Sequence, residues 1–154
     1  MTYNRVWFYV FLLGSLIVSL HTVASLADSR NQAELTKLYN SNVVKAEYVK
    51  RPMTSSDGRK RIPLIPHAGV RLTLDNGDKY LLHKGPDYGK SSDTVITPAS
   101  NMKQSTWTAK KSAPVQGKIV NDFMKNALPD KKWNAWNGNH CINAAKRAFS
   151  QTRK

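Results

Sequence analysis

The sequence predicts an α+β fold, in which a small antiparallel sheet with a hairpin packs on two C-terminal helices. Residues 69–74 alternate apolar and polar side chains, a tight turn follows, and residues 79–83 resume a strand, which is the pattern of a hairpin. Residues 117–128 and 139–149 carry apolar side chains at helical spacing. A hairpin followed by two amphipathic helices is the pattern from which the fold class follows.

The first 27 residues have the pattern of a cleaved signal peptide. Arg5 precedes an apolar run over residues 6–20, and small side chains follow at Ser25 and Ala27. A transmembrane anchor is the alternative, but this run is shorter than the roughly 20 apolar residues that a spanning helix requires. We therefore expect a secreted, extracellular protein with residues 1–27 as its signal peptide.

The chain is strongly basic, with 24 Lys and Arg residues against 10 Asp and Glu residues. Cleavage would remove one basic residue and no acidic one, so that the formal charge falls from +14 to +13. Such a charge predicts an anionic partner, either an anionic polymer such as nucleic acid or wall material, or an anionic lipid surface. The alternative is a solvated surface that only maintains solubility.

Residues 28–66 form an N-terminal segment ahead of a core at residues 67–154. Within it, residues 31–38 are a short helix candidate, and residues 43–49 fit a strand or a helical end equally well. Residues 50–66 contain three prolines, one glycine and a run of three basic residues. That composition predicts a basic loop or arm rather than a helix or strand.

The hairpin is predicted to have strands at residues 69–74 and 79–83, joined by residues 75–78. Asn76-Gly77 at its centre tolerates the positive φ angles that tight hairpin turns require. The first strand alternates apolar and polar side chains, and the second carries the apolar residues Tyr80, Leu81 and Leu82. One face of the hairpin should therefore be buried.

The length of the turn decides whether His67 and His83 share a face. A two-residue turn would pair Val70 with His83 and place the two histidines on opposite faces, because side chains alternate along a strand. A three-residue loop at residues 76–78 would pair Arg71 with His83 and place both on one face. A bulge in the first strand would have the same effect.

Residues 94–97 predict a further short strand, and residues 105–108 another, in which only Trp107 argues for burial. Residues 117–128 predict an amphipathic helix with a polar opposite face. Pro129 stops this helix because proline cannot continue the hydrogen-bond ladder.

The second helix, over residues 139–149, begins with Asn139 as a suitable N-cap and places Cys141 in its first turn. Unsatisfied amides and the helix dipole at this end favour a thiolate over a thiol. Cys141 is the only cysteine of the chain, so it has no intrachain disulfide partner. In an exported protein it is a reactive thiol, an intermolecular link or an inert structural residue.

A nucleophilic cysteine needs a base. His67 and His83 flank the hairpin, and His140 adjoins the cysteine. The alternative is that these histidines are structural, as residues at strand ends often are. The sequence has no metal-ligand spacing and no phosphate-binding glycine loop, so we expect no metal and no cofactor.

The order of these residues resembles that of the circularly permuted NlpC-like proteins, a papain-like superfamily that includes the lecithin:retinol acyltransferase-like group. In that family a histidine begins one strand, a second histidine ends the next, and a cysteine preceded by asparagine opens a later helix. The resemblance covers about residues 67–149 and rests on the segment HAGVRLTLDNGDKYLLH and on NHCIN.

This resemblance implies a permuted papain-like fold, with Cys141 as the nucleophile, His67 as the base and His83 as its polar orienting partner. It assigns no role to His140, which stands between Asn139 and the cysteine in this chain. The activity it implies is that of a cysteine-dependent hydrolase or acyltransferase.

Two functions follow for a secreted basic protein of this kind. One is a cysteine-dependent hydrolase or acyltransferase that acts on an amide or ester of an anionic substrate surface. The alternative is a non-enzymatic protein that binds anionic membranes, wall polymers or nucleic acid through its Lys and Arg side chains. In that case Cys141 is a small buried residue.

The signal peptide gives the first testable prediction. Exported protein should begin at Asp28, because Ser25 and Ala27 suit signal peptidase, with cleavage after Ala24 as the second site. N-terminal sequencing of secreted material measures this directly. A secreted form that still begins at residue 1 would contradict the prediction.

Overall fold

The computed structural model describes residues 31–54, 61–85, 94–102, 106–129, 134 and 136–153. The chain divides into two compact units, Met1–Leu38 and Tyr39–Lys154. Residues 31–38 of the first unit are helical, as the sequence predicted. The expected signal peptide at residues 1–27 lies outside the described residues. In the described part of the chain, no helix has the length and apolar character needed to cross a membrane.

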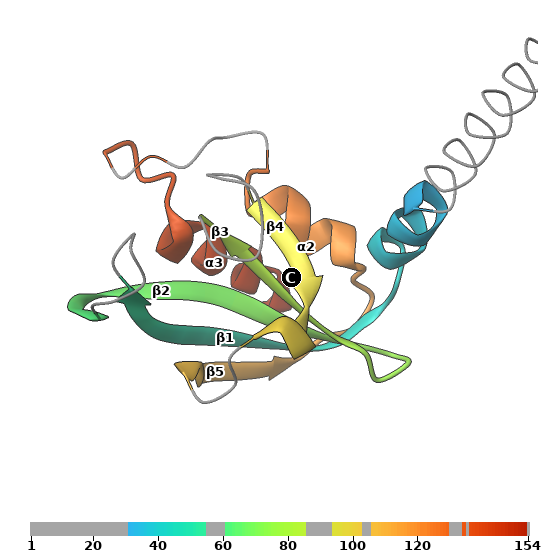
Figure 1. The fold of residues 1–154 in the computed structure, drawn as a ribbon. Helices are drawn as coiled ribbons and strands as arrows, with labels where there is room; N and C mark the ends of the chain where they lie inside the picture. The colour runs from blue at the N-terminus through green and yellow to red at the C-terminus, as the bar shows by residue number, and fades with distance from the viewer. Residues whose placement is uncertain are drawn as a thin grey trace, which may run out of the picture. The chain divides into compact units, whose positions relative to one another are not determined.

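The second unit is built on an antiparallel sheet of five strands in the order β4-β3-β2-β1-β5 (Figure 1). This sheet, packed against helices, confirms the predicted α+β class. The strands are β1 (Val43–Thr54), β2 (Arg61–Leu74), β3 (Lys79–Lys84), β4 (Thr94–Pro98) and β5 (Thr108–Pro114).

Two helices, α2 (Val120–Asn126) and α3 (Cys141–Phe149), follow the sheet in sequence. Figure 1 shows α3 running behind β2 and β3, and α3 contacts β1, β2, β3 and α2. Its buried residues are Cys141, Ala144, Ala145 and Ala148. This is the spacing of one helix face, and its small side chains let the helix approach the strands closely.

Helix α2 is shorter than the predicted residues 117–128. It begins at Val120 because the Asp122 carboxylate accepts a hydrogen bond from the Ile119 amide at 3.0 Å and so caps the first turn. Gly117 lies before it with a φ of 62°, which is outside the helical region.

Both faces of the sheet are covered. Tyr48 of β1 packs its ring against Phe149 of α3, with 6.1 Å between ring centroids, so Tyr48 faces the helices. The next residue, Val49, belongs to a second buried cluster with Leu81, Ala99, Met102 and Trp107. Because side chains alternate along a strand, this cluster lies on the other face, under the short 3-10 helix η1 (Ala99–Asn101).

The prediction for residues 50–66 is wrong at both ends of this range, where the structure has strands. Strand β1 continues to Thr54 and β2 begins at Arg61. Pro52 and Pro66 lie opposite each other in the β1–β2 pair. The β5 partners of β1 end at Lys50, and the β3 partners of β2 end at Gly69. The prolines therefore lie in a two-stranded arm where no third strand needs their missing N–H groups.

The strand expected at residues 105–108 is also misplaced, because β5 starts at Thr108 and runs to Pro114. Its lysines and proline mark an edge strand, which has a neighbour on one side only and carries charges that prevent further pairing. Such a strand lacks the alternation on which the sequence prediction relied. Trp107 is buried, as predicted.

The hairpin closes with a three-residue loop, Asp75-Asn76-Gly77. The Leu74 amide bonds to the Asp78 carbonyl at 2.9 Å, and Gly77 has a φ of 89°, the left-handed position that such loops give to glycine. The loop begins one residue earlier than the sequence alternative placed it, so His83 pairs with Gly69 rather than with Arg71 or Val70. His67 and His83 still lie on one face, because the register differs by an even number of residues.

Gly69 is required by the close approach of β3. A Cβ atom at this position would lie 2.8 Å from Leu81 Cδ1, 2.9 Å from the Leu82 carbonyl oxygen and 3.2 Å from His83 Cβ. One of these contacts is backbone, which cannot rotate away. The position of His83 therefore depends on the missing side chain of Gly69.

Replacing Gly69 with alanine should lower the free energy of unfolding by about 1–3 kcal/mol, the usual cost of overpacking a buried site. Urea denaturation measures it. The control is Gly77→Asn, because nothing lies within 4 Å of that position and asparagine tolerates a positive φ. A Gly69→Ala protein as stable as this control would contradict the close approach.

Candidate functional site

The two histidines of the hairpin are joined by a buried hydrogen bond. His67 Nε2 lies 3.2 Å from His83 Nδ1, and the ring centroids are 5.3 Å apart in an edge-to-face arrangement. His67 is 2% exposed and His83 is fully buried. The bond joins Nε2 of His67 to Nδ1 of His83, so one of these two nitrogens carries the hydrogen.

Two further side chains, Arg51 and Trp107, complete the surroundings of His67. Arg51 is the cross-strand partner of His67 in the β1–β2 pair. Its guanidinium carbon lies 5.3 Å from the centroid of the Trp107 ring, a cation–π arrangement. The Trp107 ring lies 5.6 Å from the His67 ring. Arg51 is a buried cation, with 9% of its surface exposed.

Sequence reasoning missed both residues as parts of this site. Arg51 fell in the predicted loop, and Trp107 was noted only as a buried side chain. Their place beside His67 depends on strand pairing between distant segments, so no local pattern could have found them. Only the register of β1 against β2 brings Arg51 opposite His67.

Cys141 is the first residue of α3, as the sequence predicted, but the helix is capped differently. The N-cap residue is His140, with an extended backbone and no side-chain hydrogen bond to the helix. Asn139, the predicted N-cap, instead exchanges two backbone hydrogen bonds with Asn134, at 2.9 and 3.0 Å. This backbone pairing places Asn139 one residue too early to cap α3. Cys141 itself is buried, with 4% exposure.

The thiol of Cys141 lies against backbone amides. Burial raises its pKa above the ordinary value, while hydrogen bonds from the amides of Ala68, Ile142 and Cys141 and the charge of Arg51 lower it, with burial prevailing. We expected the helix terminus to favour a thiolate, but the pKa of Cys141 in the free protein is raised overall. The amides act in the expected direction, but loss of water around the sulfur outweighs them.

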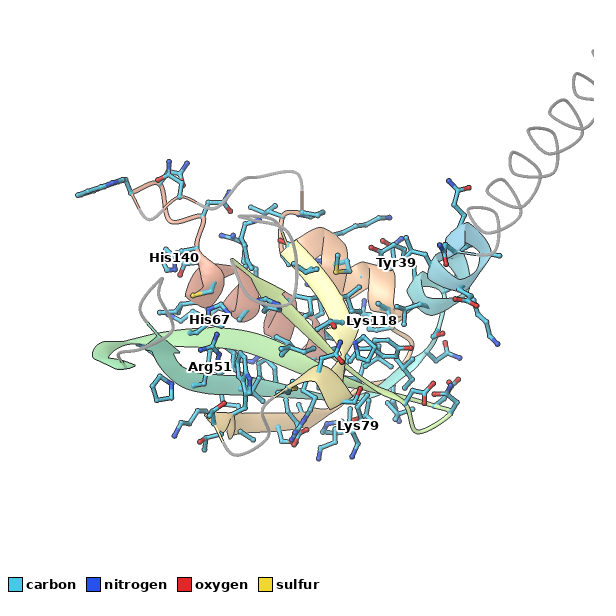
Figure 2. All side chains as sticks on the ribbon, viewed as in Figure 1. Tyr39, Arg51, His67, Lys79, Lys118 and His140 are labelled. Carbon is cyan, nitrogen blue, oxygen red and sulfur yellow. The ribbon has the colours of Figure 1, made fainter. Side chains whose placement is uncertain are left out.

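The three residues selected from the sequence lie near one end of the β2–β3 pairing, on two different faces of the sheet. The β2–β3 pairing ends at Gly69 and His83, and the thiol of Cys141 contacts the amide of Ala68, the residue between Gly69 and His67. Figure 2 shows His140, His67 and Arg51 at this same end of the domain. His67 and His83 share the Trp107 face of the sheet with Arg51, whereas α3 carries Cys141 on the Tyr48 face. The contacts seen are therefore between the two histidines, and between the thiol and the backbone of Ala68.

His67 is neutral over the physiological pH range. Burial, together with the nearby charges of His83 and Arg51, lowers its pKa from 6.5 to about 3. The neutral imidazole keeps a lone pair that can accept a proton, but its lowered pKa makes it a weak base in the free protein. The resting pair is therefore a neutral imidazole and a neutral thiol.

His140 plays a different part. Its carbonyl accepts the first helical hydrogen bond of α3, from the amide of Ala144 at 3.0 Å. Its side chain is partly exposed. Among the residues that the structure describes, no group of three or more His, Cys, Asp or Glu side chains is arranged to hold a metal ion.

Comparison with known proteins gives no relative from which a function could be transferred: no family model, no curated protein and no solved structure matches this chain significantly.

The low pKa of His67 predicts how stability depends on pH. Between about pH 6.5 and 3 the unfolded chain binds a proton at residue 67 that the folded protein does not, so stability falls as the pH is lowered through this window. Lowering the pH from 7.5 to 5 should cost about 2 kcal/mol through this group. Urea denaturation at the two pH values measures it.

A His67→Gln protein should lose this part of the pH dependence, because glutamine does not titrate. The control is His140→Gln, which removes a partly exposed histidine and should keep the slope. Identical pH dependence in the His67→Gln protein and the unmodified protein would contradict the burial of a neutral imidazole.

Proposed function

We propose that the protein is a secreted cysteine-dependent hydrolase or acyltransferase that acts on an amide or ester carbonyl. The observation that carries this proposal is the buried hydrogen bond of 3.2 Å between His67 and His83, beside the strand residue whose amide contacts the Cys141 thiol. It supports the roles that the family resemblance implies: Cys141 as nucleophile, His67 as base and His83 as the residue that orients the base.

The hydrogen bond between the two histidines determines which nitrogen of His67 can accept a proton. For Nδ1 of His67 to accept the thiol proton, Nε2 must carry hydrogen and donate it to Nδ1 of His83. His83 thus holds His67 in the required tautomer, as the third member of a catalytic triad does. Because His67 and Cys141 are both neutral at rest, the proton moves as the sulfur attacks and no ion pair is formed beforehand.

The charge that develops on the sulfur meets groups that stabilise it. Arg51 and the amides of Ala68, Ile142 and Cys141 all lower the Cys141 pKa. They are already in place, so they favour the thiolate at the moment of attack without reorganisation. N–H groups at the start of α3 would likewise stabilise the oxyanion formed at the substrate carbonyl.

The reaction proceeds through a thioester. Cys141 sulfur bonds to the carbonyl carbon, and His67 passes the thiol proton to the leaving amine or alcohol as its bond to that carbon breaks. Water, or an acceptor alcohol or amine in an acyltransferase, then attacks the thioester. His67 takes a proton from this nucleophile as it bonds to the carbonyl carbon, and returns the proton to the sulfur as the carbon–sulfur bond breaks and the acyl product leaves, which restores the free enzyme.

The burial of Cys141 favours the second candidate function, a non-enzymatic basic protein that binds an anionic surface. A thiol that is 4% exposed and has a raised pKa also fits an inert core residue. The two candidates differ in one observable property, which is the reaction of the folded protein with an acyl donor.

The folded protein should release nitrophenol from a p-nitrophenyl ester with an initial burst that reports acylation of Cys141. The Cys141→Ser protein should show no burst, and His67→Gln should acylate about a hundredfold more slowly, since general-base catalysis contributes about that much or more. Stopped-flow absorbance measures the burst, and mass spectrometry locates the acyl group.

The matched control is His140→Gln, which removes the histidine next to the cysteine and should change the acylation rate by less than about twofold, in contrast to His67→Gln. Cys141 that reacts with the ester only after denaturation would exclude the enzyme and leave the binding protein. Equal loss of rate in both histidine variants would remove His67 from the mechanism.

A further inference from the structure

A second concave site lies away from the histidine pair, where β1 and β5 meet the end of α3 and the following 3-10 helix η3 (Ser150–Arg153). This pocket has a volume of about 370 Å³, which is within the range of pockets that hold small organic ligands. Its lining residues are Tyr48, Lys50, Lys111, Lys146, Phe149, Ser150 and Arg153. They come from three stretches of the chain, which are β1, β5 and the continuous segment of α3 and η3.

Two aromatic rings form the apolar part of the pocket. Tyr48 and Phe149 pack edge to face at 6.1 Å between centroids. Tyr48 is 6% exposed, and its hydroxyl has no hydrogen-bond partner among the described residues. A buried hydroxyl without a partner is costly. The two rings offer an apolar surface to the organic part of a ligand.

The polar part of the pocket consists of cations. Four of its lining side chains are Lys or Arg, and none is acidic. Lys111 is the cross-strand partner of Tyr48, and Lys50 Nζ lies 5.7 Å from the Tyr48 ring centroid. Glu47, the carboxylate of β1, precedes Tyr48 and therefore points to the opposite face of the sheet. There it forms ion pairs with Lys45 and Arg71, not with the lysines of the pocket. The positive charges of the pocket therefore face one another without a described carboxylate between them, and an anion would relieve their repulsion.

We propose that this pocket binds an organic phosphate, with the phosphoryl group held by Lys50, Lys111, Lys146 and Arg153 and the apolar part of the ligand on Tyr48 and Phe149. A phosphomonoester suits the site better than a carboxylate, because it carries up to two charges and three acceptor oxygens for several donors. The inference goes beyond the proposed thiol chemistry and does not depend on Cys141.

The chemistry of this site is shared by two sources, a phospholipid headgroup and a soluble phosphate ester. Both present an anionic phosphoryl group attached to an apolar or organic part. Phenyl phosphate reproduces these features in a soluble probe, and inorganic phosphate lacks the apolar part. The two probes therefore separate the cationic contribution from the aromatic one.

Calorimetric titration of the protein with phenyl phosphate should show binding at one site. Lys146→Glu and Lys111→Glu should each weaken it about tenfold or more, because each loses a charge-assisted contact and adds repulsion. Phe149→Ala should weaken phenyl phosphate binding and leave inorganic phosphate binding unchanged. Cys141→Ser should bind as the unmodified protein does, so the result is separate from that of the acylation experiment.

The matched controls carry the same charge change elsewhere. Lys125 is an exposed lysine in the last turn of α2, as Lys146 is in α3, and Lys79 is an exposed lysine on a strand, as Lys111 is. Lys125→Glu and Lys79→Glu should leave binding within about twofold. Equal weakening by all four substitutions, or no binding of phenyl phosphate by the unmodified protein, would overturn the proposal.

Vesicles then identify the source. If phenyl phosphate displaces the protein from vesicles containing phosphatidic acid, whose headgroup is a phosphomonoester, and Lys146→Glu releases it while Lys125→Glu does not, the pocket takes the lipid headgroup. If vesicle binding is the same in both variants while phenyl phosphate binding differs, the pocket takes a soluble organic phosphate. Phosphatidylcholine vesicles serve as the uncharged reference.

Discussion

The register between β2 and β3 is the constraint on which the candidate site depends. A three-residue loop with Gly77 in the left-handed region pairs Gly69 with His83. This puts His67 and His83 on one face, close enough for a bond of 3.2 Å. A slip of one residue would turn one histidine to the other face of the sheet. The missing side chain of Gly69 permits this pairing, because a Cβ atom there would press on β3.

Strand β1 links the two proposed sites through the alternation of its side chains. Tyr48 and Lys50 point toward the cationic pocket, while Val49 joins the Trp107 cluster and Arg51 stacks on Trp107 beside His67. One strand thus supplies an anion-binding surface on one face and a buried cation on the other. Its partners β2 and β5 fix these positions from both sides, so a change in either pairing would alter both sites.

Burial sets the chemistry of the candidate site. It raises the pKa of Cys141 and lowers that of His67 to about 3, so both groups are neutral at rest. Arg51 contributes to both shifts and acts in the same direction on each, since its positive charge favours a thiolate and disfavours an imidazolium. A site of this kind favours transfer of a proton during attack over a thiolate–imidazolium pair formed in advance.

The α+β class, the hairpin and the position of Cys141 at a helix start could be predicted from the sequence, because alternation and helical spacing are local properties of the chain. Tertiary structure alone decided the hairpin register, the extension of β1 and β2 past Pro52 and Pro66, and the lysine-rich edge strand β5, which depend on pairing between distant residues. The burial of Lys84 likewise depends on the tertiary structure. Its Nζ donates to Thr94 Oγ1 at 2.9 Å and to the Leu128 carbonyl at 3.1 Å. The same holds for the thiol of Cys141: its place at a helix terminus could be predicted locally, but the sign of its pKa shift follows from how much water the folded protein excludes.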